Sequence, residues 1–100
     1  MIRHIAMFKF KAFESEKEKN NFFNRLKEAF DGLGNKIPEI KTIQIGFDIL
    51  HTEASYDFVV NVEVENLEAL PKYANHPDHI KAVAVIKEMA VDRKVIDYEF

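Results

Sequence analysis

The fold is decided first by residues 2–11, which read Ile2-Arg3-His4-Ile5-Ala6-Met7-Phe8-Lys9-Phe10-Lys11. Side chains in this stretch alternate with the period of two that is typical of a β-strand. The even-numbered face, from Ile2 to Phe10, is mostly apolar, whereas the odd-numbered face is apolar only in its middle, at Ile5 and Met7. We therefore predict a strand in which both faces are at least partly covered.

The same alternation recurs over residues 41–50, 56–64 and 93–100, which predicts three further strands. Between the first two strands the spacing is helical. Ser15 and Glu18 form a capping-box pattern at the start of this helix, and Gly32 and Gly34 are expected to end it. Its apolar residues recur every three or four positions: Phe22, Leu26, Ala29, Phe30 and Leu33.

The region between the third and fourth strands predicts two helices. Residues 67–73 form a short one that Pro71 limits or bends. A longer one begins at Pro77, a favourable residue for a first turn, and runs to about Met89. Its expected buried residues are Ile80, Val83, Ala84 and Ile86.

The resulting order is β-α-β-β-α-β, with the short helix preceding the second long one. This order is typical of the ferredoxin-like α+β arrangement, a four-stranded antiparallel sheet with helices on one face. The other face would leave Ile5, Met7 and Val59 exposed in a single chain. Pairing two such sheets is the simplest way to cover these residues, so we expect a homodimer.

Composition limits the classes of function. One hundred residues suit a single domain, 1–100, and the net charge of -3, with lysines scattered among glutamates, argues against nucleic acid as a partner. No cysteine is present, which removes thiol chemistry and thiolate metal sites. The N-terminal residues show no signal-peptide layout, and no apolar run approaches a membrane span. We expect a cytoplasmic protein that has no membrane partner and needs no cofactor.

Several segments resemble a known family. They are the opening strand, Ile37-Pro38-Glu39-Ile40 leading into Ile45-Gly46-Phe47-Asp48, Tyr73-Ala74-Asn75-His76-Pro77-Asp78-His79, and the ending Asp92 to Glu99. Their order and content resemble the stress-responsive A/B-barrel (Dabb) family, whose His-Pro-x-His element is the most specific match. The resemblance covers nearly the whole chain. It implies a ferredoxin-like fold and a dimer whose two sheets build a barrel-like core.

The resemblance also bears on function. Most Dabb proteins have no assigned activity, some are related to plant stress proteins, and a few are polyketide cyclases. The cyclases catalyse an intramolecular aldol condensation in a pocket between sheet and helices, using a His and a Tyr. The resemblance would make His79 the general base and Tyr73 its partner. Cyclase-type members also carry a polar, His-bearing position early in the third strand. Phe58 stands there in this chain, and it cannot move protons.

The residues themselves support two interpretations of His79. It lies in the first turn of the predicted helix, where the helix dipole disfavours a charged ring and keeps it available as a base. Alternatively, it bonds locally and caps the helix. Tyr73 would orient a carbonyl or stabilise an enolate, or else be a wall residue whose hydroxyl finds a backbone partner.

Three further residues are candidates for lining a pocket beside His79 and Tyr73. His4 shares a face with Ala6 and Phe8, so it should point under the helices. Phe58 would add an apolar wall. His76 is expected mainly to start the last helix, and although His76 and His79 are spaced like metal ligands, no third ligand accompanies them, so we expect no metal.

Three functions remain open from these residues. The first is a dimeric module that binds a small apolar molecule. The second is an enzyme of the cyclase or isomerase type with His79 as base, and the third is a structural, stress-protective dimer without a ligand. The resemblance does not point to heme-degrading monooxygenases of the same broad fold class. Convergence of His79 and Tyr73 on one cavity would separate the first two functions from the third.

Overall fold

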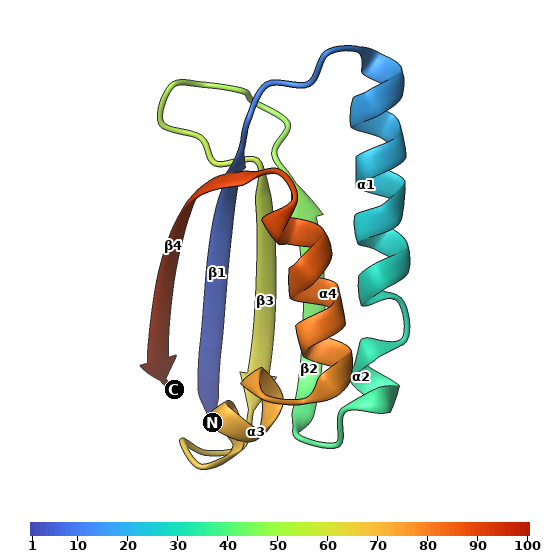
Figure 1. Ribbon diagram of the computed structural model, residues 1–100. Coiled ribbons are helices and arrows are strands. Elements are labelled where there is room, and N and C mark those ends of the chain that lie inside the picture. Colours follow the sequence, from blue (N-terminus) through green and yellow to red (C-terminus); the bar gives the residue numbers. More distant parts are fainter.

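One antiparallel sheet organises the chain, which a computed structural model describes over residues 1–100. Its strands are β1 (Ile2–Phe10), β2 (Ile40–Phe47), β3 (Phe58–Val64) and β4 (Ala90–Glu99), in the order β2-β3-β1-β4. The helices are α1 (Glu16–Phe30), α2 (Leu33–Lys36), α3 (Ala69–Ala74) and α4 (Pro77–Lys87). Figure 1 shows α1 and α4 on the same face of the sheet. The predicted ferredoxin-like fold is confirmed.

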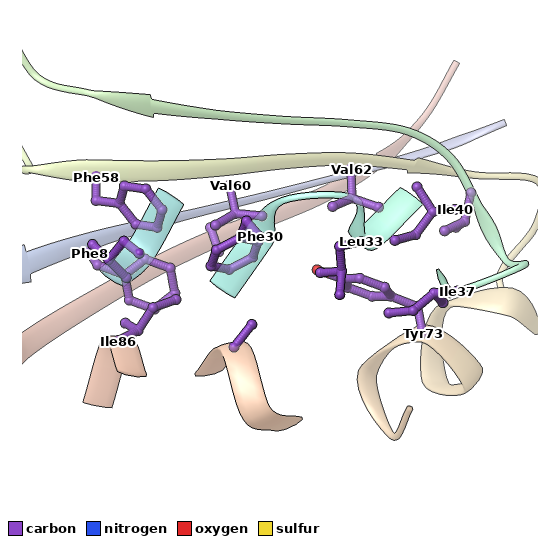
Figure 2. Packing of buried hydrophobic residues seen from close by; sticks show 14 of the residues in the cluster. Phe8, Phe30, Leu33, Ile37, Ile40, Phe58, Val60, Val62, Tyr73 and Ile86 are labelled. Atoms are coloured by element: carbon purple, nitrogen blue, oxygen red, sulfur yellow. The ribbon is translucent and has the colours of Figure 1, made fainter. Parts of the chain in front are cut away.

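The core lies between this covered face and the helices. In the central pair of strands, Ala6 is opposite Val60 and Phe8 is opposite Phe58. Every second residue of both strands is turned to the helices and buried, apart from half-buried His4. Helix α1 contributes the buried side chains of Phe22, Leu26 and Phe30, and Figure 2 shows Phe30 packed beneath Val60. The alternation read from the sequence therefore predicts the buried face correctly.

Local signals set the ends of α1. The Ser15 hydroxyl accepts a hydrogen bond from the Glu18 backbone amide at 3.1 Å, as the capping pattern predicts. Gly32 ends the helical path with a φ of 67°, in the left-handed region that glycine adopts at little cost. Gly34 does not act as a second terminator, because it lies inside the one-turn helix α2.

The buried face of α4 differs from the expected one. Ala82 and Ile86 are buried, whereas Ile80 is 56% exposed and Ala84 is also exposed. The sequence of α4 is apolar on nearly all sides, so helical periodicity alone does not identify the inward face. Packing against α1 sets the rotation of α4 instead.

Two strand ends also differ from the expected ones. Strand β2 stops at Phe47, so Ile49 is not part of the alternation and is 84% exposed in the loop. Strand β3 begins at Phe58 rather than Tyr56. The loop between them is held by polar contacts, including a hydrogen bond from the His51 backbone amide to Asp48.

The second face of the sheet is left without helices. Ile5 is opposite Ile96 on β4, and Met7 is opposite Val59 on β3, so four apolar side chains form the centre of this face. We call these four residues the open-face patch. Met7 is 38% exposed and Ile96 is 57% exposed. No helix is both long and apolar enough to cross a membrane.

Candidate functional site

A cavity of about 800 Å³ opens between the sheet and the helices α3 and α4. Its walls are mainly apolar and include Ala6 and Phe8 from β1, Phe30 from α1, and Val83 and Ile86 from α4. Polar side chains gather at its two ends. His4, Tyr73, His79 and Asp97 form one group, while Lys87, Asp92 and Arg93 lie where α4 leads into β4.

The Pro77 turn places His79 against the cavity. His76 is the N-cap of α4 and Pro77 is its first residue, so His79 follows within the first turn. The His79 Nδ1 atom lies 2.8 Å from the Ala74 carbonyl oxygen. A carbonyl oxygen only accepts hydrogen bonds, so this contact assigns the proton to Nδ1 and leaves a lone pair on Nε2.

Burial disfavours the charged form of His79. Desolvation is the main cause that lowers the pKa of its ring below the usual value of 6.5. The hydrogen bond to Ala74 acts in the opposite direction, and the nearby charges of His4, Arg93 and His76 lower the pKa further. A neutral imidazole with a free Nε2 atom can accept a proton or a hydrogen bond from a ligand.

Tyr73 contributes a hydroxyl in the same place. Its side chain is 2% exposed, and its ring centroid lies 4.4 Å from that of His79. Burial raises the pKa of the phenol, so the hydroxyl stays protonated and can donate a hydrogen bond. It has no hydrogen-bond partner within the protein, and Figure 2 shows its oxygen pointing in the direction of Phe30.

His4 completes this end of the cavity together with Asp97. The two rings of His4 and Tyr73 are 6.2 Å apart and meet edge to face. Strand pairing sets His4 opposite Asp97, and the His4 Nδ1 atom lies 2.5 Å from a carboxylate oxygen of Asp97. His4, Tyr73 and His79 therefore line one cavity, which the sequence predicts.

Two expected lining residues lie elsewhere. Phe58 is 2% exposed and packs among other rings, 5.1 Å from Phe47 and 5.9 Å from Phe30 between centroids, so it belongs to the core behind the cavity. His76 does not line the cavity either. Its Nδ1 atom accepts a hydrogen bond from the Asp78 backbone amide at 3.1 Å, which caps α4.

Asp97 and Arg93 are site residues that the sequence analysis did not identify. Both come from β4, and both face the helices because β4 pairs with β1 in the register His4–Asp97 and Phe8–Arg93. Alternation places the two residues on the same side of the strand. Which side of β4 faces the helices depends on how its residues pair with β1, and the alternation of side chains along β4 does not predict this pairing.

The fold and the cavity define a class: ferredoxin-like α+β domains with a His- and Tyr-lined cavity between sheet and helices. Within this class, the chain belongs to the stress responsive A/B barrel domain (Dabb) family, whose profile matches residues 2–100. The family resemblance read from the sequence is confirmed.

Relatives cover the chain from end to end. An uncharacterised protein of Streptomyces coelicolor is 33% identical over 100 residues, all of both chains. Olivetolic acid cyclase of Cannabis sativa is 28% identical over 99 residues, which cover 97% of this chain and 94% of the cyclase. Among solved structures, a dimeric protein of unknown function with a ferredoxin-like fold from Bacteroides fragilis has a TM-score of 0.89 and 32% identity, covering 99% of this chain and 95% of that one.

Proposed function

We propose that this protein is a homodimer in which each subunit binds a small, largely apolar molecule in the cavity beside His79 and Tyr73. One observation supports the proposal above all: an apolar cavity of about 800 Å³ holds, at one end, a phenol hydroxyl without a protein partner and an imidazole with a free nitrogen. Small-molecule sites in proteins have this character, with apolar walls and a few convergent polar groups.

The polar groups indicate what the molecule should carry. The protonated Tyr73 hydroxyl is a donor, which suits a carbonyl oxygen of the ligand. The His79 Nε2 atom is an acceptor, which suits an acidic C–H or a hydroxyl next to that carbonyl. The apolar walls would surround the remainder, so the preferred ligand is an apolar carbonyl compound.

Catalysis of the cyclase or isomerase type is the second candidate. His79 would take a proton from the carbon next to a carbonyl, and the electron pair of the broken C–H bond would move into an enolate whose oxygen Tyr73 stabilises. The lowered pKa of His79 and its ring distance of 4.4 Å from Tyr73 support this candidate. The 28% identity to olivetolic acid cyclase adds to the support.

A thermal-shift screen of small apolar ketones, esters and phenols would test binding. We expect a stabilising compound for the native protein, because a ligand that binds only the folded state raises its melting temperature. His79→Ala and Tyr73→Phe should each reduce that shift. His51→Asn is the matched control, since His51 lies in the exposed loop and Asn tolerates its positive φ of 55°.

Three outcomes would separate the candidates. An equal shift in native protein and His79→Ala would remove His79 from the binding site. Proton exchange at the carbon next to the ligand carbonyl, lost in His79→Ala, would favour the enzyme. No stabilising compound at all would favour the structural dimer without a ligand.

The homodimer is proposed from the open-face patch. Four neighbouring apolar side chains on an uncovered sheet face suit packing against a second copy of the same face. Met7→Asp would place a charge in that contact, so we expect a monomer by light scattering, or loss of folding. Ile49→Asp makes the same kind of change in the exposed loop and should leave the mass unchanged. A native protein that is monomeric at micromolar concentration would refute the proposal.

A further inference from the structure

The far end of the cavity carries cations without acidic partners. Lys87 at the end of α4 and Arg93 on β4 both line the cavity and are both exposed, so they stand at its mouth. Neither side chain takes part in an ion pair or hydrogen bond within the protein. The nearest residues on the same side of β4 as Arg93 are Val91 and Val95, which offer no charge.

The two carboxylates of the cavity are already engaged. Asp97 is bound to the His4 ring. Asp92 accepts hydrogen bonds from the Tyr56 hydroxyl and, at 2.8 Å, from the Arg93 backbone amide. Hydrogen bonds from a neutral hydroxyl and a backbone amide leave the charge of Asp92 in place, so two cations, Lys87 and Arg93, accompany one carboxylate here and the mouth is positively charged on balance.

The Arg93 guanidinium lies over the cavity rather than away from it. Its central carbon is 6.0 Å from the centroid of the Phe8 ring, which forms part of the cavity wall. Arg93 is also one of the positive charges that lower the pKa of His79, after burial as the main cause. Guanidinium groups bind carboxylates with two parallel hydrogen bonds, which makes Arg93 the better-suited anchor of the two cations.

The register shows the distance between the two ends. Asp97 is opposite His4 and Arg93 is opposite Phe8, so the ends are four residues apart, or about 13 Å along a strand. Between them the cavity is apolar, with Ala6, Val60, Val83 and Ile86 in its walls. This layout suits a molecule with an apolar body and an acidic group at one end.

We propose that the cavity selects amphipathic carboxylates, with Arg93 binding the acidic group at the mouth and the apolar body extending towards Tyr73 and His79. The inference rests on the proposed binding function and adds the class of ligand. Arg93 acts here as a specificity-determining residue. Its charge should favour an acid over a neutral molecule of the same shape.

A matched pair of probes tests this assignment: octanoate, which is charged, and octanamide, which is neutral and similar in shape. Titration calorimetry on the full-length protein at low salt should show octanoate binding about tenfold more tightly, a difference equal to about 1.4 kcal/mol. Added salt should weaken octanoate binding and leave octanamide binding nearly unchanged. NMR shifts of the Val60 and Val83 methyl groups would show that both probes enter the cavity, with Ile49 as the exposed reference.

Arg93→Gln should abolish the preference for octanoate and leave the affinity for octanamide unchanged. Lys81→Gln is the matched control, because it removes the same charge from an exposed position of α4 that does not line the cavity. Equal binding of both probes to native protein, or an unchanged preference in Arg93→Gln, would overturn the inference while leaving the binding function standing. Cavity methyl groups that respond to neither probe would overturn the inference and count against the binding function as well.

Discussion

Replacing Phe30 by alanine tests the packing that holds α1 on the sheet. The Phe30 ring is 5% exposed and lies 5.9 Å from the Phe58 ring between centroids. Removing a fully enclosed Phe side chain costs about 3–5 kcal/mol of unfolding free energy. Phe30 also lines the cavity, so part of its surface has no packed neighbour to lose. We therefore expect a loss near the lower limit, about 3 kcal/mol.

Urea unfolding followed by far-ultraviolet circular dichroism would measure this loss. All variants should be compared at one protein concentration, because the stability of a dimer depends on it. Asn24→Ala, an exposed position on the same helix, should change the free energy by less than about 0.5 kcal/mol. A loss below about 1 kcal/mol for Phe30→Ala would refute the packing described for α1.

Two further predictions concern ionisation and capping. NMR titration of the histidine rings should give His79 a pKa below 6.5, because burial disfavours its charge. Because the unfolded chain then binds a proton at His79 more readily than the folded chain does, the free energy of unfolding should decrease as the pH falls from about 7 towards the lowered pKa. A measured His79 pKa at or above 6.5 would contradict this prediction. Ser15→Ala should cost about 1 kcal/mol in the same unfolding assay, since it removes the acceptor for the Glu18 amide, whereas Ser15→Asp should retain most of the stability.

Local sequence patterns predicted much of the architecture. The alternation of Phe58, Val60, Val62 and Val64 predicted the buried face of β3, because one side of that strand is entirely apolar. Ser15 marked the start of α1, since a cap depends on residues only three positions apart. The family motif from Tyr73 to His79 predicted both candidate site residues together, because it covers only the end of α3, the short connection and the first turn of α4.

Local sequence patterns did not predict the buried residues correctly where more than one face of an element is apolar. Ile80 and Ala84 were expected inside, yet Ala82 and Ile86 are buried, because an apolar helix carries no polar stripe to mark its outer face. Phe58 was expected to line the pocket. Its neighbours Phe10, Phe30 and Phe47 come from three different elements and enclose it in the core.

Local patterns along the chain specify the order of the elements, the helix-facing sides of β1 and β3, and the position of His79 in the first turn of α4. These features depend on residues close together in the chain. The pairing of β4 with β1, in the register that sets Asp97 beside His4 and Arg93 beside Phe8, is known from the three-dimensional arrangement and not from local patterns. A shift of one residue would turn both charges to the opposite face, and that choice depends on contacts between residues about ninety positions apart.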